Sequence, residues 1–155
     1  MTERPTFSYN GLPVRAAGTL IIVETPTSTH RLFRQINNKF EDIGGKTDSS
    51  DTSEIDTAVR ETCEETHGKL FHPNHTMQDC ERILRDLIAT NCQVEYNKRS
   101  KYLLFKLYVH EGILDMSMKR FGLEEKTDWG VLQHYYKWLR YCPRKLHPRL
   151  YGMAL

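Results

Sequence analysis

Apolar and polar positions along the chain predict strands near its start and again after its middle. Residues 16–24 (AAGTLIIVE) are apolar and β-branched and end before Pro26, which is typical of a buried strand. Residues 30–36 (HRLFRQI) alternate and are expected to form its hairpin partner. Residues 40–46 (FEDIGGK) predict a short strand running into a glycine pair, and residues 102–109 (YLLFKLYV) carry the strongest strand signal.

Helical periodicity appears in two segments between these strands. The first helix is expected over residues 54–67, with Thr52 or Ser53 as N-cap and Gly68 as the stop signal. The second is expected over residues 77–90, where the apolar stripe consists of Met77, Cys80, Ile83, Leu84, Leu87 and Ile88. We expect this second helix to be an insertion.

The remaining segments carry weaker signals. Residues 1–13 are interpreted as a polar N-terminal arm, and residues 91–101 as a polar hairpin region. Residues 129–132 predict a short last strand, and a closing helix is expected from the spacing of Val131, Leu132, Tyr135, Tyr136 and Leu139. Strands precede and follow the helices without strict alternation, which favours an α+β fold with a mixed sheet between helical layers.

Composition narrows the class of protein. With 155 residues and 18.2 kDa, the default is one domain spanning residues 1–155, ending in a basic tail over residues 141–155. The hydrophobic fraction of 39% and charged fraction of 27% argue against disorder and against a membrane protein. The net charge of +2 does not demand a nucleic acid as partner, although a local patch can still bind phosphate. Four scattered cysteines and the lack of a leader indicate a reduced, cytoplasmic protein.

Glutamates gather on one face of the first predicted helix. At about 100° per residue, Glu61, Glu64 and Glu65 share an arc of about 100°, opposite the apolar positions. Like charges at this spacing destabilise a helix by about 0.2–0.5 kcal/mol per pair, and Arg60 can neutralise only Glu64. A divalent cation such as Mg²⁺ or Mn²⁺ would relieve the remainder, whereas the alternative is a solvated acidic face.

A glycine pair lies just upstream of these glutamates, where the backbone can approach a ligand closely. The order Gly44-Gly45-Lys46, Arg60-Glu61-x-x-Glu64-Glu65, Gly68 resembles the Nudix box, the signature of the Nudix hydrolases. The resemblance covers about residues 14–140, and the box is its sharp part. It implies an α/β/α sandwich that cleaves a pyrophosphate in a nucleoside diphosphate linked to a group X.

Site residues follow from this resemblance by position. Glu61, Glu64 and Glu65 would be ligands of Mg²⁺ or Mn²⁺, one of them assisting the attacking water. The Gly44 carbonyl would be a further ligand, and Arg60 would hold the glutamates by charge-assisted hydrogen bonds. Many Nudix enzymes add a glutamate from a loop shortly before a tryptophan on the last strand. Glu124 and Glu125 precede Trp129 in this arrangement, and Glu124 is the preferred candidate. Glu111 is a further candidate.

Departures from the usual box fall in its loop and at its end. The loop between Gly45 and Arg60 is one residue longer, and the usual mid-loop glutamate is replaced by Thr52, with Asp51 beside it as a possible substitute. The closing glycine also comes one residue late. The variant Asp-x-Gly-Gly-Lys over residues 42–46 is similar to Nudix proteins of large DNA viruses.

Basic residues supply candidates for phosphate contacts. Arg15 and Lys46 flank the expected cleft and are interpreted as substrate-phosphate contacts or as solvated charges. Basic residues also form two groups, of which the second is interleaved with aromatic residues and could contact RNA. They consist of Lys98, Arg99 and Lys101, and of Arg140, Arg144, Lys145 and Arg149. The competing interpretation of the aromatic residues is core packing.

The sequence therefore predicts a metal-dependent hydrolase acting on a nucleotide derivative or a nucleoside triphosphate. The alternatives are an mRNA decapping hydrolase that releases m7GDP, a diphosphoinositol polyphosphate hydrolase, and a non-catalytic Nudix-fold binding module. Expected partners are a nucleotide substrate and, for decapping, capped RNA. No membrane partner is expected, and the protein is expected to be a monomer or a homodimer.

Overall fold

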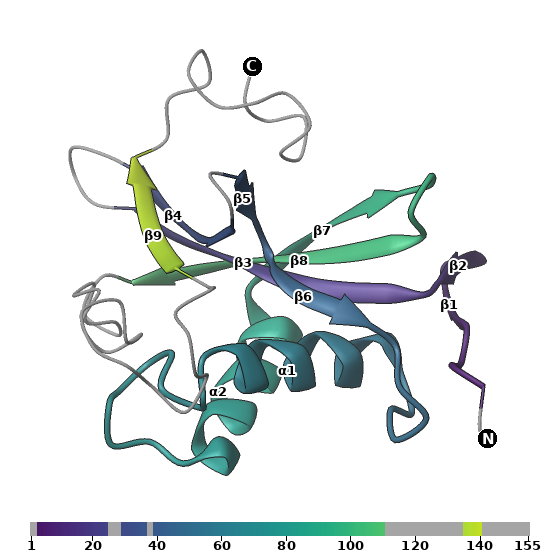
Figure 1. Ribbon diagram of the computed structural model, residues 1–155, viewed down its shortest axis with the longest axis horizontal. Coiled ribbons are helices and arrows are strands. Elements are labelled where there is room, and N and C mark those ends of the chain that lie inside the picture. The colour runs from purple at the N-terminus through teal and green to yellow at the C-terminus, as the bar shows by residue number, and fades with distance from the viewer. Residues whose placement is uncertain (1–2, 25–28, 37–38, 111–134, 141–155) are drawn as a thin grey trace.

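A mixed β-sheet dominates the structure, a computed structural model that describes residues 3–24, 29–36, 39–110 and 135–140. Figure 1 shows the sheet crossing the molecule, with both described helices on one side of it. The strands of this sheet are β3 (Ala16–Glu24), β4 (Thr29–Ile36), β5 (Lys39–Glu41), β6 (Ile43–Lys46), β7 (Cys92–Asn97), β8 (Tyr102–His110) and β9 (Tyr135–Arg140). The predicted hairpins and the strongest predicted strand are therefore present.

Strand β3 organises the sheet because it has partners along both edges. On one edge it pairs in parallel with β8 over its whole length, from Ala16 opposite Tyr102 to Glu24 opposite His110. On the other edge its first half pairs with β6 and its second half with β4, both antiparallel. This combination of parallel and antiparallel neighbours confirms the expected mixed sheet of an α+β fold.

Both predicted helices form, and local caps set their ends. Helix α1 (Glu54–Glu65) begins after Ser53, whose side chain accepts a hydrogen bond from the backbone N–H of Asp56. The helix ends at Glu65, two residues before the predicted end, because the chain leaves helical geometry at Thr66 and then adopts φ angles of +53° at His67 and +73° at Gly68. Helix α2 (Met77–Thr90) has the predicted bounds and a capping box at its start.

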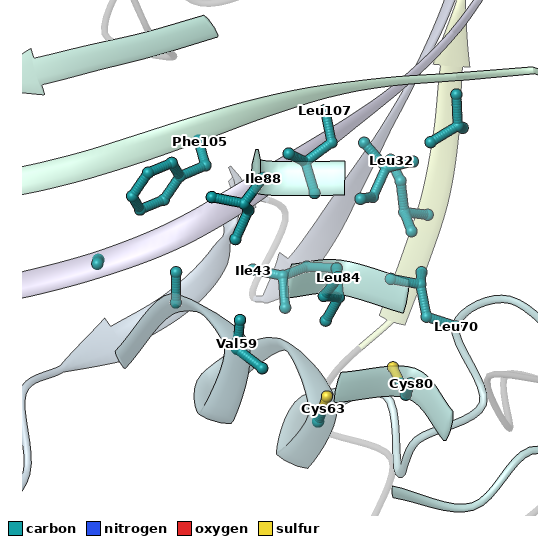
Figure 2. Packing of buried hydrophobic residues seen from close by; sticks show 14 of the residues in the cluster. Leu32, Ile43, Val59, Cys63, Leu70, Cys80, Leu84, Ile88, Phe105 and Leu107 are labelled. Atoms are coloured by element: carbon teal, nitrogen blue, oxygen red, sulfur yellow. The ribbon is translucent and has the colours of Figure 1, made fainter. Parts of the chain in front are cut away.

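The main hydrophobic core lies between these helices and one face of the sheet. Figure 2 shows α1 and α2 contributing Val59, Cys63, Cys80 and Leu84 beneath strand residues such as Leu107. Alternation along β3 sends Ala17, Thr19 and Ile21 to this face. The intervening Leu20 and Ile22 join a smaller cluster on the opposite face, together with Phe33 and Leu104.

The expected closing helix is wrong for residues 135–140. These residues form β9, which pairs antiparallel with β4 from His30 opposite Arg140 to Gln35 opposite Tyr135. The segment YYKWLR is rich in aromatic residues, which favour strands, and the outer edge of β4 offers backbone partners that a single-sequence pattern does not reveal. The predicted strand over 129–132 and the basic tail lie outside the described residues.

The N-terminal arm contains a small hairpin that the sequence analysis missed. Strands β1 (Phe7–Tyr9) and β2 (Leu12–Val14) pair antiparallel, and Asn10 and Gly11 between them have φ angles of +50° and +82°. An Asn-Gly pair with two positive φ angles is the preferred two-residue hairpin turn. No helix in the described part of the chain is long and apolar enough to cross a membrane.

Candidate functional site

The Glu61 carboxylate lies against the glycine pair of β6. A Cβ atom placed on Gly45 would come within 2.5 Å of the Cδ and Oε2 atoms of Glu61, so only glycine leaves room for the carboxylate there. Helix α1 is fixed in this position by a buried hydrogen bond of 2.8 Å between the hydroxyl groups of Thr62 and Thr19 on β3. Gly45 and Glu61 therefore form one structural unit.

Arg60 connects the elements around this unit. Its Nη1 donates to Oε1 of Glu61 and to Oε1 of Glu64, both at 2.9 Å, and its Nη2 donates to the carbonyl of Lys46 at 2.9 Å. The other side of the guanidinium contacts Asp51 through Nε at 2.9 Å and Nη2 at 3.0 Å. The expected pairing of Arg60 with Glu64 is thus present, and the same guanidinium also orients Glu61.

Asp51 is the loop carboxylate that contacts Arg60. Its side chain is almost fully buried and accepts from Thr57 Oγ1 at 2.8 Å and from the backbone N–H of Asp48 at 2.9 Å, besides Arg60. Burial raises its pKa, but these hydrogen bonds outweigh burial and leave the pKa below its usual value. Thr52 bonds instead to Asp56, so of the two weighed positions Asp51 is the one that contacts Arg60.

The glutamate cluster has an electrostatic imbalance that a cation would relieve. Burial raises the pKa of Glu61, Arg60 opposes that effect, and the charges of Glu64 and Glu65 raise the pKa further. Among the described residues, no three histidine, cysteine or acidic side chains already converge on a metal position. However, Glu61 and Glu64 both reach the same nitrogen of Arg60, and Mg²⁺ commonly takes one or two carboxylates plus substrate phosphates. Glu61 and Glu64 are therefore two carboxylates of the chemical type that Mg²⁺ takes as ligands.

The carbonyl of Gly44 points away from the partner strand. Thr47 donates its backbone N–H to the Arg15 carbonyl at 3.1 Å, and hydrogen-bonded pairs alternate along antiparallel strands. Gly45 opposite Ala17 is therefore a hydrogen-bonded pair, whereas Gly44 opposite Gly18 is not. The Gly44 carbonyl therefore faces the outer edge of β6.

The two predicted phosphate contacts, Arg15 and Lys46, differ in what they bind. Arg15 donates from Nη1 to the Arg4 carbonyl at 2.9 Å and to Thr6 Oγ1 at 3.0 Å, so it anchors the N-terminal arm. Lys46 is exposed, and its backbone carbonyl, rather than its ammonium group, is tied to Arg60. The candidates Glu111, Glu124 and Glu125 lie outside the described residues.

The sequence analysis missed a second glycine contact on the opposite face of the sheet. Gly18 and Gly44 face each other across β3 and β6, and the hydroxyl of Tyr102 fills the space that their side chains would occupy. The same hydroxyl donates to Asp42, just before β6. The available signal was a glycine inside the otherwise apolar strand at residues 16–24, since glycine there marks a close approach.

Comparison with known proteins gives distant structural likenesses. No protein-family model matches the chain, and no curated protein matches it significantly. Ap4A hydrolase of C. elegans is 17% identical, with a TM-score of 0.43 over 83% of this chain and 80% of that chain, and its binary complex is 19% identical, with a TM-score of 0.42 over 80% and 78%. NrtR of Shewanella oneidensis, complexed with a 27mer DNA, is 12% identical, with a TM-score of 0.39 over 90% of this chain and 59% of that chain.

Proposed function

We propose that this protein is a Nudix-type hydrolase that uses Mg²⁺ or Mn²⁺ to cleave a pyrophosphate. The substrate would be a nucleoside diphosphate linked to a group X, or a nucleoside triphosphate. The observation that carries the proposal is the unit formed by Gly45, Glu61 and Arg60, in which a glycine makes room for a carboxylate that the arginine orients. A merely solvated acidic helix face would need neither the glycine nor the buried partner Asp51.

The residues of the proposed site have distinct roles. Glu61, Glu64 and Glu65 would hold the metal together with the Gly44 carbonyl, and Glu124 would complete the site. The bound metal would neutralise charge developing on the pyrophosphate and lower the pKa of the attacking water. Arg60 orients Glu61 and Glu64, and the contact from Asp51 fixes Arg60 in turn. Lys46 would contact a substrate phosphate, whereas Arg15 donates its hydrogen bonds to the N-terminal arm.

A substrate panel tests the proposal. Nucleoside triphosphates, nucleotide sugars, dinucleoside polyphosphates, diphosphoinositol polyphosphates and cap-labelled RNA are incubated with Mg²⁺ or Mn²⁺. The wild type is compared with Glu64→Gln and with Glu54→Gln, which makes the same change on the same helix outside the cluster. We expect turnover that falls at least a hundredfold in Glu64→Gln and stays within twofold in Glu54→Gln. Equal rates in the two variants would rule out the assigned cluster.

The panel also separates the competing functions. Release of m7GDP from capped RNA would identify a decapping hydrolase, and turnover of inositol pyrophosphates alone would identify the diphosphoinositol class. The absence of turnover of every substrate, combined with tight binding of a nucleotide, would favour a binding module. The intact Arg60, Glu61, Glu64 and Glu65 support the catalytic alternatives, because a module without turnover has no need of the full set.

A further inference from the structure

A group of cations at one end of the sheet has no acidic partner among the residues that the structure describes. In the described part of the chain, cations elsewhere such as Arg60, Arg82, Arg85 and Lys106 each pair with a carboxylate. Seven others form no ion pair with a described residue. One of them, Lys69, donates to the His75 carbonyl. We call the other six the basic end: Arg4, Arg15, Lys46, Lys98, Arg99 and Lys101. The segregation of these unpaired charges is the observation to be explained.

The sheet register brings the basic end together. Ala16 lies between Lys46 on one neighbouring strand and Tyr102 on the other. One residue earlier, the backbone N–H of Arg15 donates to the Lys101 carbonyl at 2.9 Å. The arm joins through Arg4, whose carbonyl accepts from Arg15 at 2.9 Å. Figure 1 shows the β1–β2 hairpin, the end of β6 and the β7–β8 turn at the same end of the molecule.

The charges of the basic end are available to a ligand. Lys46 and the three cations of the β7–β8 turn are exposed. Arg4 and Arg15 are half-buried, and their hydrogen bonds all go to neutral oxygens, namely each other's carbonyls and the Thr6 hydroxyl. Within two residues of these six cations in the chain, the carboxylates are Glu3 and Asp48, so the cations outnumber them. A surface of this kind attracts polyanions.

We propose that the basic end binds the phosphodiester backbone of single-stranded RNA. Three neighbouring strands span about 10 Å, and the turn carrying Lys98 and Arg99 extends the surface further, which suits consecutive phosphates better than a single one. Half-buried Tyr96, at the base of this turn, offers one ring on which a base can stack. A membrane surface fits less well, because Leu12 is the one exposed large apolar side chain described at this end.

A binding measurement without turnover tests this surface. Fluorescence anisotropy follows a labelled 20-nucleotide single-stranded RNA in the presence of a chelator, over a range of salt concentrations. The variant Lys98→Gln/Arg99→Gln/Lys101→Gln is compared with Lys69→Gln/Arg82→Gln/Arg85→Gln, which removes the same charge on the α2 side of the molecule. We expect the first variant to lose at least tenfold in affinity and about 2 in salt slope, since each phosphate contact on a single strand contributes about 0.7. The second should change affinity less than threefold.

Other results would overturn the proposal. Equal losses in the two triple variants would mean that net charge alone attracts RNA. A wild-type Kd weaker than about 100 µM at 150 mM salt, or binding of inorganic polyphosphate without binding of RNA, would remove RNA as the ligand. Thermal melting checks that both variants fold, and the single variant Lys46→Gln provides a second test on another strand, with an expected loss of two- to fourfold. Because the chelator prevents metal-dependent turnover, failure here is distinct from failure of the proposed hydrolase.

Discussion

The carboxylate of Glu61 on α1 lies directly over the backbone of Gly45 on β6. Its Cδ and Oε2 atoms occupy the space within 2.5 Å of where a Cβ of residue 45 would stand. The two residues are sixteen positions apart in the chain, and the loop between them is held by Asp51 and Arg60. The position of the first glutamate of the cluster therefore depends on the absence of a side chain on a neighbouring strand.

Alanine in place of Gly45 should change the metal dependence of turnover, whereas alanine in place of Gly44 should change the stability of the fold. The three atoms nearest to a Cβ at residue 45 all belong to the flexible end of Glu61, so in Gly45→Ala stability should change little while Glu61 is displaced. We expect the Mg²⁺ concentration for half-maximal rate to rise at least tenfold. Gly44→Ala instead meets the Gly18 Cα at 2.6 Å and the Ala17 carbonyl oxygen at 2.7 Å, both backbone atoms. It should destabilise the fold by about 1–3 kcal/mol or more, as overpacking does.

Urea unfolding and metal titration of turnover distinguish these effects. Gly45→Ala should keep the wild-type midpoint of unfolding, and Gly44→Ala should lower it. A Gly45→Ala protein with wild-type metal dependence would show that Glu61 does not need its observed position.

Replacing the buried carboxylate in the loop should weaken both fold and site. Asp51→Asn loses the charge-assisted contacts to Arg60, and hydrogen bonds to charged groups contribute about 1.5–3 kcal/mol. We expect a decrease of about 2 kcal/mol in the free energy of unfolding and a lower turnover rate. Asp86→Asn on the exposed side of α2 is the matched control and should change neither quantity. Equal stability of the two variants would contradict the structural role of Asp51.

Acid should reveal the same interaction in the wild type. The pKa of Asp51 lies below its usual value in the folded protein, so its contribution to stability is full above the unfolded-state pKa of about 3.9. That contribution is lost as the pH falls through the lower, folded-state pKa. The stability difference between wild type and Asp51→Asn should therefore shrink from pH 5 toward pH 2, as measured by urea unfolding at each pH. A difference that is constant over this range would exclude the linkage.

The hydrogen bond between Thr19 and Thr62 should show strong coupling. Both side chains are fully buried, so Thr19→Val or Thr62→Val alone leaves one hydroxyl without its partner. Each single change should cost about 1–3 kcal/mol, whereas the double variant, which removes both hydroxyls, should be nearly neutral. A double-mutant cycle by chemical denaturation measures this coupling. Additive losses would mean that the two hydroxyls do not depend on each other.

Local signals made most of the fold predictable. The apolar runs of β3 and β8 and the ends of α1 and α2 depend on residues within a few positions, such as the Ser53 cap and the Gly68 stop. Strand β9 was mistaken for a helix, because its pairing with β4 joins segments about a hundred residues apart. The β1–β2 hairpin was missed although its Asn-Gly turn was visible, since its short flanking strands carry little hydrophobic pattern.

The candidate site was predictable to the extent that it lies on one helix. The spacing of Glu61, Glu64 and Arg60 is a property of α1, and the contacts among them follow from it. The partner of Arg15 was not predictable, because it depends on how the N-terminal arm folds back. Asp51 was only one of two possibilities until the path of the longer loop showed which side chain reaches Arg60.

The parallel pairing of β3 with β8 has a consequence for synthesis of the chain. Residues 16–24 emerge from the ribosome long before residues 102–110, which are their partners along one whole edge. Until then β3 presents an apolar strand with unpaired backbone groups, a state prone to association between chains. Nascent or truncated chains that end before residue 102 should therefore aggregate, and slow closure of this long-range pairing should limit the rate of folding.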